Sequence, residues 1–393
     1  MPDRVTVTHS TGWFSRVADS IKSLVFGAAL FVAAFPVLFW NEGRAVKTAR
    51  SLAEGSGIVV SVSPDGVDSA NEGRLVHVSA SAKTDDVLGD DTFGISETAI
   101  RLVREVEMYQ WVESESSKTE KKLGGGEETV TTYEYSKEWR DSLVDSAGFQ
   151  SPDGHQNSAA FPYEERTETA SVVSLGAFTL SAEQIQMLNR SEALAVAELP
   201  SELSENARLE DGAIYIGAAP SSPAVGDARV RFHVVRPGEV SVVASQTGSS
   251  FEPYLAEAGG TIFLLEESVA SAAAMFETAQ TNNAIATWLI RGLGFFLMFL
   301  GLFLVFRPIA VLGDVVPFVG SLLRAGVGVV SALMAAVFSL ITIAVGWFAY
   351  RPFLAVVLVA LGVGAFFLLI RVARQKPGRV ALAGPPPLPS PRS

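Results

Sequence analysis

The stretch LVFGAALFVAAFPVLFW at residues 24–40 contains no charged side chain. A helix needs about 20 predominantly apolar residues to cross the hydrocarbon core of a bilayer, so this stretch predicts a membrane helix over residues 21–40. Three more uncharged apolar runs lie near the end of the chain, at 292–306, 325–350 and 353–370. The sequence therefore predicts an integral, multi-pass membrane protein with four transmembrane helices.

The first apolar run could also belong to a cleaved signal peptide, because Lys22 precedes it. Cleavage needs small residues at the end of the apolar run, but this run ends with Phe35, Pro36, Phe39 and Trp40. Aromatic residues of this kind suit the membrane interface. We therefore interpret the run as an uncleaved anchor.

The charge of the chain is unevenly distributed. The whole chain has 30 Lys and Arg against 42 Asp and Glu, a net charge of −12. Twelve of the basic and three of the acidic residues lie outside residues 41–287, which leaves 18 basic and 39 acidic residues within them, a net of −21. An acidic domain is repelled by nucleic acid, so the sequence predicts a solvated domain with no nucleic-acid partner.

The basic residues near the end of the chain predict the orientation. Arg371, Arg374, Lys376 and Arg379 follow the last apolar run with no acidic residue among them. Short flanks rich in Lys and Arg stay in the cytoplasm, so both termini are expected there. The acidic domain is then expected in the bacterial periplasm or, in a eukaryote, in the lumen of the endoplasmic reticulum or nuclear envelope. The chain has no cysteine, which excludes disulfides and thiolate metal sites.

The predicted fold is an α+β extramembrane domain, with a mixed sheet plus helices, inserted between the first and second of four transmembrane α-helices. The predicted segments are a cytoplasmic N-terminal segment (1–20), the first transmembrane helix (21–40), the acidic domain (41–287), the second helix (288–306), a cytoplasmic link (307–324), the third helix (325–350), the fourth helix (353–370) and a basic, Pro-rich cytoplasmic tail (371–393).

A β-hairpin is the clearest element expected in the acidic domain. Residues 106–112 and 129–135 alternate in polarity and place aromatic residues on one face, and Gly124, Gly125 and Gly126 lie between them. Aromatic pairs across strands stabilise a sheet, so Trp111 is expected to be buried. Further strands are expected at 58–62, 75–79, 172–175, 213–217, 229–235, 240–245 and 261–265, and helices at 45–54, from Ser181 with a capping box to Gln184, and at 268–281.

One short repeat is visible. The tetrad Asn-Glu-Gly-Arg occurs at 41–44, after an apolar run, and again at 71–74, before an expected strand. Because the contexts differ, we interpret the repeat as coincidence. A weaker similarity between residues 74–112 and 229–246 leaves an internal duplication open.

Several blocks of the chain resemble the transmembrane protein 43 family, also called LUMA. These blocks are NEGRA at 41–45, SLAEG at 51–55, NEGRLVH at 71–77, VEMYQWVE at 106–113, EWR at 138–140 and GWFAYRP at 346–352. The resemblance implies a multi-pass protein of internal membranes that self-associates. Animal members are expected in the inner nuclear membrane and endoplasmic reticulum, organising the nuclear envelope with lamins and emerin. The Ala, Val, Gly and Asp bias suggests a bacterial member of the inner membrane, without those two partners.

The sequence assigns no catalytic, cofactor-binding or metal residue and no cofactor. A metal site would need His77 and His233 brought together with a carboxylate, and isolated histidines in strands are more often packed or exposed. The chain has neither a Gly-x-Ser-x-Gly elbow nor a His-Glu-x-x-His motif. Arg291 is expected at the outer end of the second helix and Asp314 in the cytoplasmic link. Arg351 is expected in the turn at the outer interface, where it either pairs with a lipid phosphate or an acid of the domain, or only marks the interface.

The leading interpretation is a scaffold that organises a membrane through its large domain and through self-association. Its expected partners are membrane lipid, other membrane proteins and further copies of the chain. Glycines in the apolar runs allow close helix packing, and an oligomeric pore stays open as an alternative. The second candidate is an envelope enzyme or processing factor that acts on lipid or glycan at the outer face of the membrane.

Overall fold

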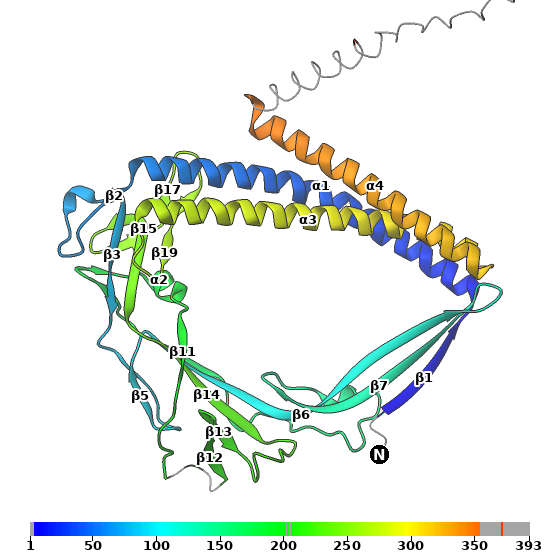
Figure 1. Cartoon of the computed structure of the whole chain (residues 1–393), viewed down its shortest axis with the longest axis horizontal. Coiled ribbons are helices and arrows are strands. Elements are labelled where there is room, and N and C mark those ends of the chain that lie inside the picture. The colour runs from blue at the N-terminus through cyan, green and yellow to red at the C-terminus, as the bar shows by residue number, and fades with distance from the viewer. Residues whose placement is uncertain (1–3, 202, 204–205, 354–370, 372–393) are drawn as a thin grey trace, which may run out of the picture.

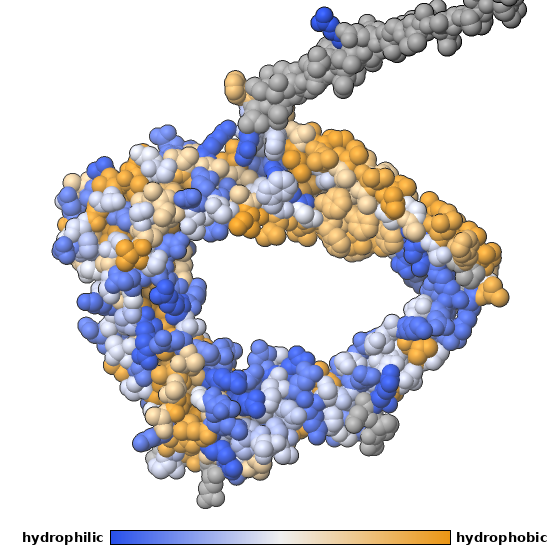
Figure 2. Space-filling model, in the orientation of Figure 1, coloured by the Kyte–Doolittle hydropathy of each residue, from blue (hydrophilic) through white to orange (hydrophobic). Residues whose placement is uncertain are grey.

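The chain forms a closed ring, with three long helices on one side and β-sheets on the others (Figure 1). This computed structural model describes residues 4–201, 203, 206–353 and 371. An opening passes through the middle of the ring (Figure 2). The extramembrane part has the expected mixture of sheets and helices.

The three long helices are α1 (Trp13–Ile58), α3 (Ala272–Gly313) and α4 (Pro317–Tyr350). All three are long and apolar enough to cross a membrane, and each contains one of the predicted apolar runs. The expected fourth helix at 353–370 lies outside the described residues except for its first residue. The helices also extend beyond the apolar runs, so that only residues 314–316 separate α3 from α4, where a link over 307–324 was expected.

Helices α1 and α3 run antiparallel and in close contact because small residues lie where they face each other. A Cβ atom added to Gly27 would lie 2.6 Å from the carbonyl oxygen of Gly301, and Gly294 makes room for Leu38. Small residues allow this approach of two backbones. Ala335 of α4 completes the apolar core of the bundle.

The larger sheet forms the side of the ring opposite the helices, in the strand order β1-β7-β6-β14-β13-β12, with β11 beside β14 and β8 beside β6. Its strands are β1 (Arg4–Thr11), β6 (Arg101–Lys121), β7 (Glu127–Arg140), β8 (Arg166–Thr169), β11 (Ser191–Leu194), β12 (Ala207–Glu210), β13 (Ala213–Ile216) and β14 (Ala228–Val235).

The second sheet lies under one end of the helices and has the order β10-β9-β3-β15-β16, with β19 beside β15 and β2 beside β3. Its strands are β2 (Val60–Ser61), β3 (Leu75–Lys83), β9 (Ser174–Leu175), β10 (Phe178–Thr179), β15 (Gly238–Thr247), β16 (Ser250–Glu252) and β19 (Leu264–Glu266). Two small hairpins, β4 (Val87–Asp90) with β5 (Ile95–Thr98) and β17 (Tyr254–Leu255) with β18 (Thr261–Ile262), complete the described strands. Helix α2 (Ala182–Met187) has the predicted capping box between Ser181 and Gln184.

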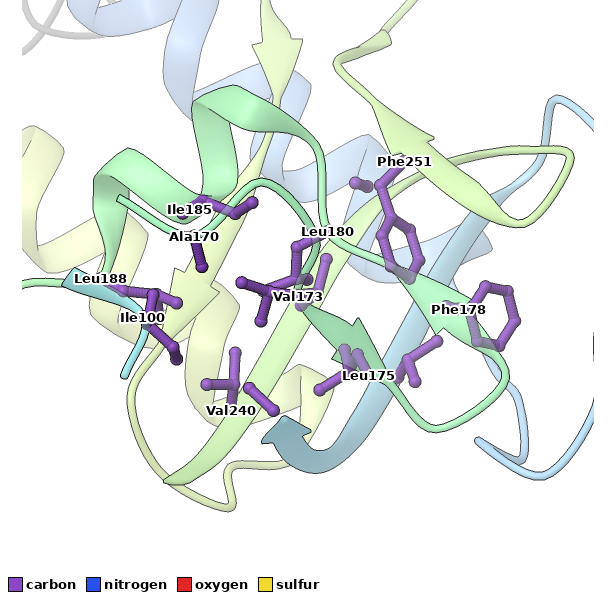
Figure 3. Packing of buried hydrophobic residues seen from close by; sticks show 14 of the residues in the cluster. Ile100, Ala170, Val173, Leu175, Phe178, Leu180, Ile185, Leu188, Val240 and Phe251 are labelled. Carbon is purple, nitrogen blue, oxygen red and sulfur yellow. The ribbon is translucent and has the colours of Figure 1, made fainter. Parts of the chain in front are cut away.

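Two apolar cores stabilise the second sheet. The first packs Val240 of β15 against Leu180, Ile185 and Leu188 around α2 (Figure 3). The second joins the sheet to the helices, because Leu52 of α1 and Phe276 of α3 pack with residues of β3, β15 and β18. This second core fixes one end of the helix pair to the β-domain.

The predicted hairpin is present as β6 and β7, and it is longer than expected. The two strands pair from Met108–Arg140 out to Lys121–Glu127, and Gly124 and Gly125 at the turn have φ values of +88° and +83°. The hairpin leaves the apolar core near Met108 and continues into solvent. For this reason the expectation that Trp111 is buried is wrong.

Trp111 is half-buried, with Lys137 above its face at 4.6 Å and His155 against its ring at 4.7 Å. The N-terminal segment (1–20), where no strand was expected, also contains one. Residues Arg4–Thr11 form β1, which pairs along its whole length with β7, from Arg4–Glu134 to Thr11–Glu127. Alternating valines at 5 and 7 suit a strand, but its partner lies more than a hundred residues away in sequence.

We predict that Phe232→Ala lowers the free energy of unfolding by about 3–5 kcal/mol, as truncation of a buried aromatic does. Phe232 is 1% exposed and its ring lies 5.6 Å from that of Phe93. The measurement is denaturant unfolding of the purified chain in detergent. Trp111→Ala is the control, and because Trp111 is half-buried its effect should be clearly smaller. Equal losses from the two changes would contradict this description of the core.

Candidate functional site

A buried carboxylate lies where the three long helices meet. Glu42 of α1 is 1% exposed and accepts two hydrogen bonds from Arg291 of α3, at 2.7 Å from Nε and 2.8 Å from Nη2. It accepts a third from Trp347 Nε1 of α4, at 2.8 Å. The guanidinium of Arg291 also lies over the ring of Trp288, 4.8 Å from its centre. One side chain therefore joins all three helices.

The neighbours of Glu42 extend this network. Asn41 is fully buried and donates from Nδ2 to the carbonyl oxygen of Thr287 at 3.1 Å. Arg44 donates to Asn283 Oδ1 and to Thr287 Oγ1, both at 3.2 Å. A Cβ atom at Gly43 would lie 2.7 Å from the ring of Tyr350. All four residues of the first tetrad therefore contact α3 or α4.

The two copies of the tetrad share one local contact. The Arg44 and Arg74 guanidiniums each donate to the Asn three residues earlier, at 3.2 and 3.3 Å. The second copy, however, lies beside β3, and only the first joins long helices. Sequence reasoning missed this role. The available signal was an acid directly after an apolar run, since ionisable residues in membrane segments usually find a buried partner.

Burying the Glu42–Arg291 ion pair costs desolvation energy. We therefore expect the pair to select one arrangement of the helices more than to add net stability. Replacing a buried pair by apolar residues is often neutral, whereas removing one partner costs about 3–5 kcal/mol. The bidentate geometry of Arg291 on Glu42 fixes the rotation of α1 against α3. Trp347 then fixes α4 on the same carboxylate.

A second buried carboxylate lies at the opposite end of the bundle. Asp314 is 0% exposed and follows α3. It forms ion pairs with Arg16 of α1, with Lys121 at the tip of the β6–β7 hairpin and with Arg324 of α4, the last at 3.0 Å. Arg16 also pairs with Glu127 of β7 at 2.7 Å. We call these five residues the clasp.

Backbone groups reinforce the clasp. The carbonyl oxygen of Gly125 accepts a hydrogen bond from Arg16, and the Gly124 amide donates to the Val315 carbonyl oxygen at 3.4 Å. Trp13 Nε1 donates to the Val311 carbonyl oxygen at 3.2 Å. The hairpin tip is therefore attached to the ends of α1 and α3, and this contact closes the ring.

The charges of the clasp keep Asp314 ionised. Burial raises the pKa of this carboxyl, but hydrogen bonds from Lys121 and Arg16 and the charges of Lys121 and Arg324 lower it more, so the pKa lies below its usual value of 3.8. The clasp holds three cations and two carboxylates, so each carboxylate has a cationic partner. Opening it near neutral pH would leave charges without partners.

The other residues considered from sequence are not brought together. His77 lies between Ser61 Oγ, at 3.2 Å, and the Ala270 carbonyl oxygen, at 2.9 Å. His233 belongs to the other sheet and faces Glu105 at 3.2 Å. Within the described residues, no group of three or more His, Asp and Glu is arranged to hold a metal ion.

A buried tyrosine on β7 holds a loop of the β-domain in place. Tyr135 donates to Glu113 Oε2 at 2.7 Å and accepts from the Ser151 amide at 2.8 Å, and its ring stacks on His155 at 4.0 Å. Burial and the Glu113 hydrogen bond raise the pKa of Tyr135 to about 12. A phenol with this pKa stays protonated near neutral pH and fixes the loop around Ser151.

The motif blocks at 41–45 and 346–352 thus meet on one carboxylate, although 300 residues separate them. The sequence profile of the family described as "Transmembrane protein 43" matches residues 108–352. The chain belongs to this family. It is 37% identical over 362 residues to transmembrane protein 43 of Mus musculus, covering 89% of this chain and 90% of the mouse protein.

Other relatives cover the chain to a similar extent. Transmembrane protein 43 of Homo sapiens is 34% identical over 371 residues, covering 91% of this chain and 92% of the human protein. The Drosophila melanogaster homolog is 31% identical over 354 residues, covering 88% and 94%. No solved structure matches the chain. The resemblance found from the motifs is therefore confirmed, and with it a membrane protein of this family.

We predict that Glu42→Gln destabilises the helix bundle by about 3–5 kcal/mol, because it leaves the Arg291 guanidinium buried without its carboxylate. Thermal unfolding of the purified chain in detergent measures the effect. The double variant Glu42→Gln with Arg291→Gln should recover part of the loss, since neither charge is then left unpaired. A double variant that is less stable than both single variants would contradict the pairing.

We predict that the clasp opens in acid. A carboxyl whose pKa is depressed by folding contributes stability above its unfolded pKa of 3.8, and this contribution is lost as the pH falls through the folded pKa. Spin labels on Leu123→Cys and Phe318→Cys, both exposed sites, report the distance between hairpin tip and α4 in a chain without native cysteine. The distance distribution should be narrow at neutral pH and broad well below pH 3.8.

Asp314→Asn is the matched control for the acid response. Without the carboxylate, the distribution should be broad at both pH values. A narrow, pH-independent distribution in Asp314→Asn would show that the ion pairs do not hold the hairpin tip.

Proposed function

We propose that this family member is a membrane scaffold whose polar β-frame holds an apolar helix bundle at both ends and acts from one face of the bilayer. The observation that carries the proposal is the closed ring. At one end, Leu52 and Phe276 pack in the core of the second sheet. At the other end, the clasp joins Asp314 to the hairpin tip. The apolar core at one end and the ion pairs of the clasp at the other connect the helices to the β-frame.

The composition of the hairpin supports a one-sided arrangement. Strand β7 has 14 residues, which is about 46 Å at 3.3 Å per residue, longer than the hydrocarbon core of about 30 Å. The outgoing strand β6 and the turn after it carry Glu113, Glu115, Lys118, Glu120, Lys121 and Lys122. At up to about 3 kcal/mol for each charge, the value at the bilayer centre, these six would cost at most about 18 kcal/mol before any pairing, compared with about 5–15 kcal/mol for the stability of a typical domain.

The hairpin therefore has to stay in water along its length, while its tip stays attached to the ends of α1 and α3. If the bundle crossed the bilayer with the clasp closed, the hairpin would have to cross as well. We infer that the bundle lies within the leaflet that faces the β-domain. The pairing of β1 with β7 favours the N-terminal strand and the acidic domain on the same side, instead of the opposite sides expected from the sequence.

The surface of the bundle suits contact with lipid on several sides. Apolar side chains cover the outer face of the helices and also the edge of the opening (Figure 2), and Phe26, Phe296 and Leu333 are among the exposed ones. A helix that is apolar all round is surrounded by apolar material. A layer of helices about 10 Å thick fits within one leaflet of about 15 Å.

Helix α4 offers a surface for self-association. Gly294 and Gly301 of α3 are used inside the bundle, but nothing lies within 4 Å of a Cβ atom added at Gly326 or Gly328 of α4. Small residues on an open helix face allow a second helix to approach closely. We infer that copies of the chain meet along α4, in the inner membrane of a bacterium or, in a eukaryote, in the endoplasmic reticulum or inner nuclear membrane.

Energy transfer between labelled copies in vesicles tests the scaffold proposal. Donor and acceptor dyes go on Val87→Cys, an exposed site of β4, at a low ratio of protein to lipid. Transfer should exceed that of randomly placed molecules, because the copies associate. Gly326→Leu combined with Gly328→Leu should reduce it to the random value, whereas the control Gly292→Leu, also in open space, should leave it unchanged.

Two outcomes would contradict the proposal. Random transfer for the unmodified chain would exclude self-association under these conditions. Mass spectrometry of the vesicle lipids tests the other candidate. If the lipids are chemically converted during the incubation, the envelope enzyme is favoured instead.

A further inference from the structure

A pocket of about 600 Å³ lies where α1 and α4 meet the loop between β17 and β18. Its wall includes Trp40, Arg44, Lys47 and Arg50 of α1, Tyr350 of α4 and Ala258 of the loop. It lies beside the Glu42 network, because Arg44 belongs to both. The pocket therefore opens at the level where the helix pair leaves its apolar section and joins the second sheet.

Three cations of the pocket share one face of α1. Arg44, Lys47 and Arg50 follow one another at a spacing of three residues, which places them side by side on a helix. Within the described residues none of them forms an ion pair. Arg44 and Arg50 donate only to neutral oxygens, at Asn41, Asn283, Thr287 and the Tyr350 carbonyl.

Arg44, the cation of this row that belongs to the Glu42 network, has one N–H group that forms no hydrogen bond. Arg44 Nε is buried and has no hydrogen-bond partner. A row of like charges repels itself, and residues 41–287 carry a net charge of −21 that could have supplied acidic partners. Glu54, four residues after Arg50, accepts hydrogen bonds from the backbone of Glu257 and Ala258 instead of pairing with these cations. Three neighbouring cations that form no ion pair among the described residues of such an acidic domain point to an anionic ligand.

Aromatic residues place the pocket at the depth of lipid headgroups. Trp40 ends the first apolar run and is 60% exposed, and Tyr350 ends α4. Trp and Tyr gather at the interface between hydrocarbon and water. Arg351 lies next to Tyr350, with its guanidinium 6.0 Å from the centre of the Trp347 ring. An anion bound here has apolar helix surface on one side and water on the other.

We propose that this pocket binds the phosphate group of an anionic phospholipid, with Lys47 and Arg50 as the principal cations and Trp40 and Tyr350 beside the glycerol region. Arg recognises phosphate through paired N–H groups and Lys acts as a compact charge. The acyl chains then continue along the exposed apolar surface of α1 and α4. The inference requires only that residues 24–40 contact lipid, so it does not depend on self-association.

Lipid binding to the purified full chain in mild detergent tests the proposal, with native mass spectrometry as the readout. The probes are dioleoyl phosphatidylglycerol, dioleoyl phosphatidylcholine and inorganic phosphate. The variant is Lys47→Gln with Arg50→Gln, both at exposed positions. The matched control is Lys118→Gln with Arg4→Gln, which removes the same charges from exposed sites on the hairpin and β1.

The unmodified chain should retain phosphatidylglycerol in preference to phosphatidylcholine. The pocket variant should lose this preference by about thirtyfold, since it removes two basic residues that each contribute about 1 kcal/mol near an anionic headgroup. The control should keep it, and both variants should have the melting temperature of the unmodified chain. Equal binding of the two lipids, or a preference that survives in the pocket variant, would overturn the proposal. Displacement of phosphatidylglycerol by millimolar inorganic phosphate would identify free phosphate as the ligand instead.

Discussion

The buried carboxylate of Asp314 ties the hairpin tip to the helix ends, and the rest of the architecture depends on this contact. The carboxylate is fully buried among Arg16, Lys121 and Arg324. Lys121 comes from the polar hairpin and Arg16 from the start of α1. The contact therefore joins the polar β-domain to the apolar helix bundle. An apolar bundle is thereby held at both ends by a frame that cannot enter hydrocarbon. The proposed one-sided arrangement rests on these two observations.

The opposite end of the bundle uses the same chemistry for a different purpose. Glu42 faces the other helices and fixes α3 and α4 through Arg291 and Trp347. Lys47 and Arg50, about two turns further along, line an open pocket. One short section of α1 therefore carries an acid paired inside the protein and cations left for an outside partner. All four residues of the tetrad at 41–44 contact α3 or α4, although the same tetrad at 71–74 lies beside β3.

The features that could be predicted from sequence are those set by local residues. The apolar run at 24–40 predicted α1, the Gly-rich turn at 124–126 with its alternating flanks predicted the β6–β7 hairpin, and Ser181 with Gln184 predicted the start of α2. The features that were missed depend on distant partners. Residues Arg4–Thr11 become a strand only because β7 offers an edge, and Trp111 is half-buried instead of buried because the hairpin extends beyond the core. Likewise, Asp314 was expected in a link and Arg291 at a helix end, and their partners Lys121 and Glu42 are distant in sequence.

The central claim is that the helix bundle lies within one leaflet while the frame holds both of its ends. Spin labels at successive single cysteines from 24 to 38, in vesicles, measure the depth of α1 through their relative accessibility to oxygen and to a water-soluble nickel chelate. The chain has no native cysteine, so each label reports one position. The account predicts a depth that oscillates with a period of about 3.6 residues around one shallow value. A depth that increases steadily to the bilayer centre and then decreases towards the other surface would contradict it.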